Sequence, residues 1–63
     1  MWTSVYMTQN IDTARAVRSR IESNSIITVM RRICDENNSG TDCYDILVPR
    51  AELDAALEIL IDN

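Results

Sequence analysis

The two cysteines of the chain, Cys34 and Cys43, are the residues best suited to redox chemistry. They flank a polar loop, so they could face each other across its ends and form a redox switch. No histidine or lysine stands near either thiol in the sequence to activate it. We therefore expect reduced, semi-buried thiols that behave as small apolar residues.

Arginine supplies all of the positive side-chain charge, because the six basic residues include no lysine. Its planar fork binds carboxylates and phosphates, so Arg31, Arg32 and Arg15 are candidate contacts for a small anion or nucleotide. The competing interpretation, which we favour, is surface charge paired with the ten acidic residues. No glycine-rich phosphate loop supports the anion site, since Gly40 is the only glycine.

The acidic loop at residues 35–42 resembles the opening of a calcium-binding loop, with Asp35, Asn37 and Ser39 at alternate positions. The position that requires a bidentate glutamate is Ile46, and the segments around the loop are predicted strands. General acid–base catalysis would need carboxylates held in a pocket, for which 63 residues leave little room. We therefore expect no metal, no cofactor and no catalytic residue, and hence no enzyme.

Length, composition and charge narrow the class of protein. A chain of 63 residues forms a single domain, residues 1–63, and buries only about 60% of its unfolded surface. The net charge of −4 opposes binding to nucleic acid. No apolar run approaches the roughly 20 residues that span a membrane, and the first residues lack the basic region of a signal peptide. We expect a cytoplasmic protein in which oligomerisation adds stability.

The first half of the chain predicts a strand followed by a helix. Residues 2–8 are rich in aromatic and β-branched side chains, which are typical of strands. Residues 11–23 carry apolar side chains at helical spacing. Asn10 is the predicted N-cap, and Asn24 is the predicted left-handed residue that ends the helix.

The second half predicts two strands and a second helix. Residues 26–34 form the second predicted strand, whose inward face is ambiguous. The two candidate inward sets are Ile26, Thr28 and Met30, or Ile27, Val29 and Ile33. Residues 43–48 form the third strand, which Pro49 ends because proline has no N–H to donate. The last predicted helix runs from Arg50 onward, and its apolar stripe consists of Leu53, Ala56, Leu57, Leu60 and Ile61.

These elements predict an α+β, ferredoxin-like β-α-β-β-α domain, a three-stranded sheet with two helices on one face. The loop between the second and third strands predicts an antiparallel hairpin. The crossover through the first helix puts the first and third strands side by side, and we expect them to be parallel. Since the fourth strand of the ferredoxin-like plan is missing, residues 2–8 remain an open edge.

The same pattern is similar to a prokaryotic family of small signal-transducing proteins. The residues that carry the resemblance are Val5-Tyr6, Asn10, Ala14, Val17, Ile21, Tyr44-Asp45-Ile46-Leu47-Val48-Pro49, Ala56 and Ile59-Leu60. The resemblance implies a β-α-β-β-α fold, related in shape to the ferredoxin-like nitrogen-regulatory signal proteins, and it brings no catalytic residues. The family often has a glycine after its first helix, where this chain has Asn24-Ser25.

One face of the first strand is the best candidate for a binding surface. If the helices cover Val5 and Met7, strict alternation leaves the aromatic side chains on the bare face of the sheet. Exposed apolar patches mark interfaces, and aromatic residues are enriched there. The alternative is that Trp2 folds over the edge of the domain. The candidate interface residues are Trp2, Ser4, Tyr6 and Leu47.

We therefore expect a small cytoplasmic regulatory or protein-interaction module of signal transduction. Its expected partners are a second copy, forming a homodimer, and an unidentified protein, but neither nucleic acid nor a membrane. The dimer forms either by stacking of sheet faces, which we slightly prefer, or by pairing of strand edges. The alternative function is a sensor that binds a small anionic metabolite or nucleotide through its arginines.

Overall fold

A computed structural model describes residues 1–34 and 42–61 of the chain. These residues form three strands and two helices in the predicted order. The elements are β1 (Trp2–Thr8), α1 (Ile11–Glu22), β2 (Val29–Cys34), β3 (Asp42–Pro49), the short 3-10 turn η1 (Arg50–Glu52) and α2 (Leu53–Ile61). The prediction of an α+β domain is confirmed, and Pro49 ends the third strand as expected.

The sheet is antiparallel, with strand order β1-β3-β2. The predicted hairpin between β2 and β3 and the predicted adjacency of β1 and β3 are confirmed. The predicted parallel direction of β1 and β3 is wrong. A crossover through α1 makes β1 and β2 parallel, and the hairpin then reverses the chain, so β3 must run opposite to both.

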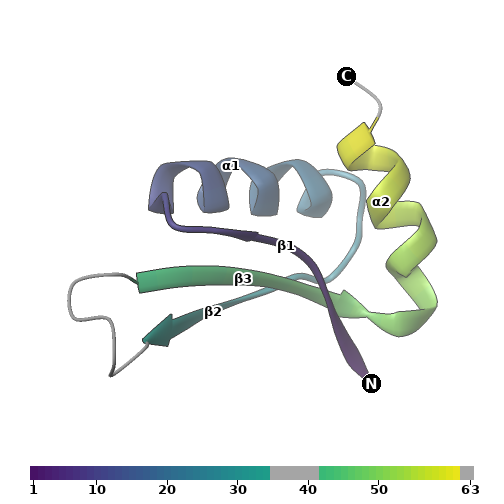
Figure 1. The fold of residues 1–63 in the computed structure, drawn as a ribbon. Coiled ribbons are helices and arrows are strands. Elements are labelled where there is room, and N and C mark those ends of the chain that lie inside the picture. Colours follow the sequence, from purple (N-terminus) through teal and green to yellow (C-terminus); the bar gives the residue numbers. More distant parts are fainter. Residues whose placement is uncertain (35–41, 62–63) are drawn as a thin grey trace.

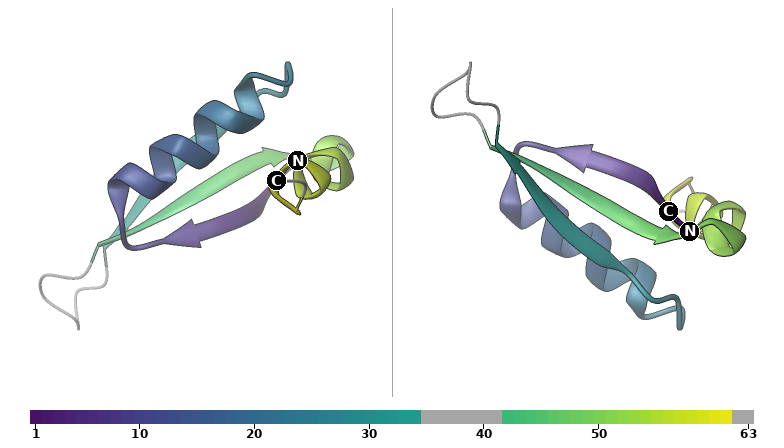
Figure 2. Two further views of the ribbon diagram at one scale, coloured as in Figure 1. Left: turned by 90° about the horizontal axis from the view of Figure 1, so that it is seen from above. Right: turned by 90° about the horizontal axis from the view of Figure 1, so that it is seen from below.

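Both helices lie on one side of the sheet (Figure 1). Helix α1 runs along the strands, whereas α2 stands at the end where β1 begins and β3 ends. Seen from the other side, the three strands lie in front of α1, and no described element covers them (Figure 2). We call this uncovered side the open face.

The core lies between the sheet and the helices. Helix α1 contributes Ala14 and Ile21, and the central strand contributes Ile46 and Val48, all of them fully buried. Alternation explains the strand residues, because Ile46 and Val48 share one face of β3. Helical spacing explains the α1 residues, and Ala56 completes the core from α2.

The ambiguity of the second strand is resolved in favour of Ile26, Thr28 and Met30. Ile26 and Thr28 are buried, and Met30 packs against the core. Ile27 is 70% exposed. The first three residues of the predicted strand are irregular, and the strand begins only at Val29.

The apolar stripe of α2 differs from the predicted one. Ile59 and Leu60 pack against the core, whereas Ile61 is 79% exposed and Leu57 is also exposed. The helix stands at the end of the sheet and not flat upon it (Figure 1). The part of the helix surface that contacts the core is therefore narrower than the predicted five-residue stripe.

Helix α1 begins where the sequence predicts. The Asn10 side chain accepts hydrogen bonds from the backbone N–H groups of Asp12 at 2.8 Å and Thr13 at 3.2 Å. These bonds satisfy two of the donors that a helix leaves unpaired at its N-terminus.

The C-terminal end of α1 departs from the prediction by one residue. Ser25, not Asn24, adopts the left-handed conformation, with φ of 64°. The Asn24 side chain instead donates to the Arg20 carbonyl at 2.9 Å, and the Ser25 N–H donates to the Glu22 carbonyl at 3.0 Å. A residue with a Cβ atom is disfavoured in this conformation, and glycine is not.

We therefore expect Ser25→Gly to stabilise the protein by about 0.5–1 kcal/mol, because it removes the cost of a left-handed serine. Ser25→Val should destabilise it, since a β-branched residue is least tolerant of positive φ. Chemical unfolding of the two variants and the wild type measures both changes. Equal stability of the glycine and wild-type proteins would contradict the prediction.

Candidate functional site on the open face

A β-bulge in β1 decides which side chains reach the open face. Ser4 lies opposite Leu47 on β3, but the next paired residue of β1 is Tyr6, opposite Ile46. Val5 is therefore the extra residue, and it packs against the core. A bulge of one residue reverses the alternation of every residue that follows it.

The bulge exchanges the predicted positions of Tyr6 and Met7. Tyr6 lies opposite Ile46, a core residue, so the register places it on the helix side. Met7 lies opposite Asp45 and joins the open face. The facing of Trp2 and Ser4 agrees with the prediction, whereas the predicted facing of Tyr6 and Met7 is wrong.

The open face combines exposed apolar side chains with one polar group. By register, its members are Trp2, Ser4 and Met7 of β1, Val29, Arg31 and Ile33 of β2, and Cys43, Asp45 and Leu47 of β3. Trp2 is 48% exposed, Met7 56% and Val29 41%. An apolar patch of this kind on the uncovered face of a sheet is typical of an interaction surface.

Asp45 lies in the middle of this face and is nevertheless buried. The Ser4 hydroxyl of β1 donates to its Oδ1 atom, and Nη2 of Arg31 on β2 lies 3.2 Å from Oδ2. One carboxylate thus joins all three strands. Buried charges require such partners, because dehydration of an unpaired carboxylate is costly.

The three arginines predicted to contact an anion do not share a face. Arg31 lies opposite Asp45 on the open face, whereas its neighbour Arg32 lies opposite Tyr44 on the helix side. Arg32 also forms an ion pair with Asp42, with Nε and Oδ2 3.7 Å apart. Arg15 is exposed on α1. The ion pairs of Arg31 and Arg32 agree with the interpretation of paired surface charge.

Cys43 carries a free, half-buried thiol on the open face. Its register partner on β2 is Ile33, whereas Cys34 lies opposite Asp42. The two cysteines are therefore not directly opposed across the hairpin. This pairing agrees with the interpretation of Cys43 as a small, half-buried apolar residue.

We expect a reducing agent to leave the melting temperature of the wild-type protein unchanged, because no disulfide contributes to its stability. The double variant Cys34→Ser with Cys43→Ser should also fold. Thermal unfolding with and without dithiothreitol measures the first effect. A large drop in melting temperature on reduction would demonstrate a disulfide.

Residues 1–34 and 42–61 contain neither a cluster of metal ligands nor a membrane-spanning helix. No group of three or more potential ligands in this part of the chain could hold a metal ion. None of the helices in this part of the chain has both the length and the apolar character needed to cross a bilayer. Asp35, Asn37 and Ser39 of the calcium-like loop lie outside the described residues.

The comparisons with known proteins add no relative. Neither family models, nor curated proteins, nor solved structures gave a match to this chain.

Proposed function

We propose that this protein is a small protein-interaction module that forms a homodimer through its open face. The observation that carries the proposal is the exposure of Trp2, Met7 and Val29 on the one side of the sheet that no described element covers. Burial of large apolar side chains is the main driving force of association. A second copy brings an identical patch, and two-fold pairing of identical surfaces is the commonest mode of assembly.

The edges of the sheet support a second copy as the partner. Strand β1 is an edge strand of seven residues. It contains no charged residue and no proline, although such residues normally protect an edge strand from pairing with another strand. The opposite edge strand, β2, carries Arg31 and Arg32. Stacking of open faces remains the preferred mode, because edge pairing alone leaves Trp2 and Met7 exposed to water.

The size of the surface predicts a dimer of modest strength. A stable interface buries about 800 Å² on each partner, which is about a sixth of the 4532 Å² that this chain exposes. Three strands at about 4.8 Å spacing form a strip only about 14 Å wide. We therefore expect dissociation to be measurable by dilution.

The family and the cellular role are part of the same proposal. We interpret the three-stranded sheet, with strand order β1-β3-β2, as a ferredoxin-like sheet without its fourth strand. The resemblance of the residues around Tyr44 and Pro49 is the basis for proposing a place among the small prokaryotic signal-transducing proteins and a regulatory role in the cytoplasm. The sensor alternative is weaker, because Arg31 and Arg32 already contact carboxylates.

Sedimentation velocity over roughly micromolar to millimolar protein tests the proposal. We expect a concentration-dependent dimer whose formation shifts tryptophan fluorescence to the blue, because stacking buries Trp2. Edge pairing would instead protect the outward amides of β1 from hydrogen exchange. A protein that stays monomeric with unchanged fluorescence would overturn the homodimer. Thermal stabilisation by micromolar nucleotide or acidic metabolite would favour the sensor.

A further inference from the structure

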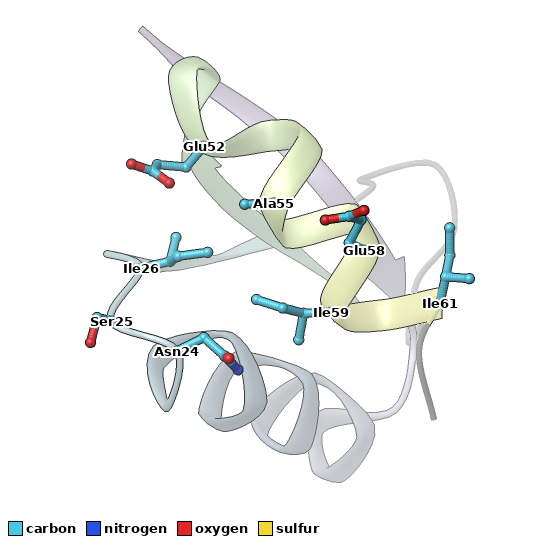
Figure 3. A pocket seen from close by; sticks show the side chains of 8 residues that line it. All are labelled: Asn24, Ser25, Ile26, Glu52, Ala55, Glu58, Ile59 and Ile61. Carbon is cyan, nitrogen blue, oxygen red and sulfur yellow. The ribbon is translucent and has the colours of Figure 1, made fainter.

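A groove runs between α2 and the chain segment that follows α1 (Figure 3). It has a volume of about 820 Å³. Its apolar lining comes from Ile26, Ala55, Ile59 and Ile61, and its polar lining from Asn24, Ser25, Glu52 and Glu58. The groove belongs to the helix side of the domain and shares no residue with the open face.

The charged lining of the groove is wholly acidic. Glu52 and Glu58 are both exposed, and neither makes a hydrogen bond or ion pair with any residue of the described chain. They are six residues apart, which corresponds to about 9 Å along a helix. Between them lies Ala55, whose small side chain leaves the groove open at this point, and Ile59 points into the groove (Figure 3). Two carboxylates thus flank an apolar floor.

This lining is complementary to a chain segment that is both basic and apolar. Leucine-like side chains would cover Ile59 and Ile61, and lysine or arginine side chains would meet the two carboxylates. A small ligand fits less well, because small-molecule sites bury most of the ligand surface. Here Glu52, Ala55, Glu58 and Ile61 are all exposed.

We propose that this groove, lined by Ile26, Ile59, Glu52 and Glu58, binds a basic amphipathic segment of a partner protein. The segment lies along α2 in the manner of a helix in a groove. Basic side chains about 9 Å apart along the segment would match the spacing of the carboxylates. The proposal is independent of the homodimer, because the open face takes no part in it.

The test is an NMR titration of the isotopically labelled protein with a two-heptad helical peptide of leucine, alanine and lysine. We expect amide shifts that concentrate at residues 24–26 and along α2, with the open face unaffected. The same peptide with glutamate in place of lysine should bind at least tenfold more weakly. Shifts confined to the open face, or no saturable shifts, would overturn the proposal.

Variants of the protein separate this site from general attraction between opposite charges. Glu52→Gln with Glu58→Gln should weaken binding of the lysine peptide about tenfold. Glu22→Gln with Asp54→Asn removes the same charge outside the groove and should leave the affinity unchanged. Equal losses in both double variants would overturn the site.

A third variant tests the shape of the groove. Ala55→Lys places a long cationic side chain in the groove at an exposed helix position, where lysine is well tolerated. It should abolish binding while the dimer, measured by sedimentation, stays as in the wild type. Undiminished peptide binding by this folded variant would overturn the groove as the docking site.

Discussion

Replacement of Trp2 by alanine together with Met7 by serine is expected to weaken self-association about a hundredfold. Both side chains lie on the open face with about half of their surface exposed. Burial of the exposed half is worth about 0.75 kcal/mol for each side chain. A two-fold dimer buries four of them, which adds up to about 3 kcal/mol. Sedimentation equilibrium of the variant and the wild type measures the change in the dimer dissociation constant.

The bulge in β1 supplies a matched control for this experiment. Tyr6→Ser removes a large, partly exposed side chain next to Met7, but the register places Tyr6 on the helix side. A dimer formed by stacked open faces should therefore tolerate Tyr6→Ser. If Tyr6→Ser dissociates the dimer as strongly as Met7→Ser, edge pairing of β1 replaces stacking as the mode of assembly.

Arg31→Gln should destabilise the protein by about 1–2 kcal/mol, whereas Arg32→Gln should cost less than about 0.5 kcal/mol. The sequence alone predicts equal, small effects, because both residues look like surface arginines. The structure separates them, since Arg31 contacts the buried Asp45 and Arg32 contacts the half-exposed Asp42. Among the described residues, loss of Arg31 leaves the buried carboxylate with only the Ser4 hydroxyl as a partner. Urea unfolding of both variants measures the difference.

A double-mutant cycle identifies the cause of the Arg31 effect. Asp45→Asn in the background of Arg31→Gln removes the uncompensated charge and should recover part of the lost stability. In the wild-type background, Asp45→Asn should itself be destabilising. Additive losses in the double variant would show that the two side chains act independently, contrary to the observed contact.

Most of the fold follows from the periodicity of the sequence. Apolar residues at helical spacing, among them Ala14 and Ile21, identify α1 and its buried face. Alternation of apolar residues, with Ile46 and Val48 on one face, does the same for β3. The residue that ends α1 was harder to predict from the sequence, because Asn24 and Ser25 can both adopt the left-handed backbone conformation. The predicted direction of β3 relative to β1 was wrong, although the two strands themselves were correctly identified.

The site was harder to predict, because it depends on which residues of different strands lie opposite each other. Nothing in the order Ser4-Val5-Tyr6 indicates that Val5 is the extra residue of a bulge. Alternation alone puts Asp45 on the same face as Leu47. Its burial depends on Ser4 and Arg31, which are 41 and 14 residues away in the sequence. These pairings are set by packing of the whole sheet.

The buried position of Asp45 also affects how any partner can bind. If a carboxylate on the open face were hydrated in the folded monomer, binding of a partner would have to remove its hydration water, at a cost of several kcal/mol. Here folding has already removed that water, and the outward surface of the ion pair is the Arg31 side chain, which is 61% exposed. An arginine is weakly hydrated and stacks on aromatic rings. The centre of the face therefore presents an incoming surface with a flat, easily dehydrated cation in place of an acid.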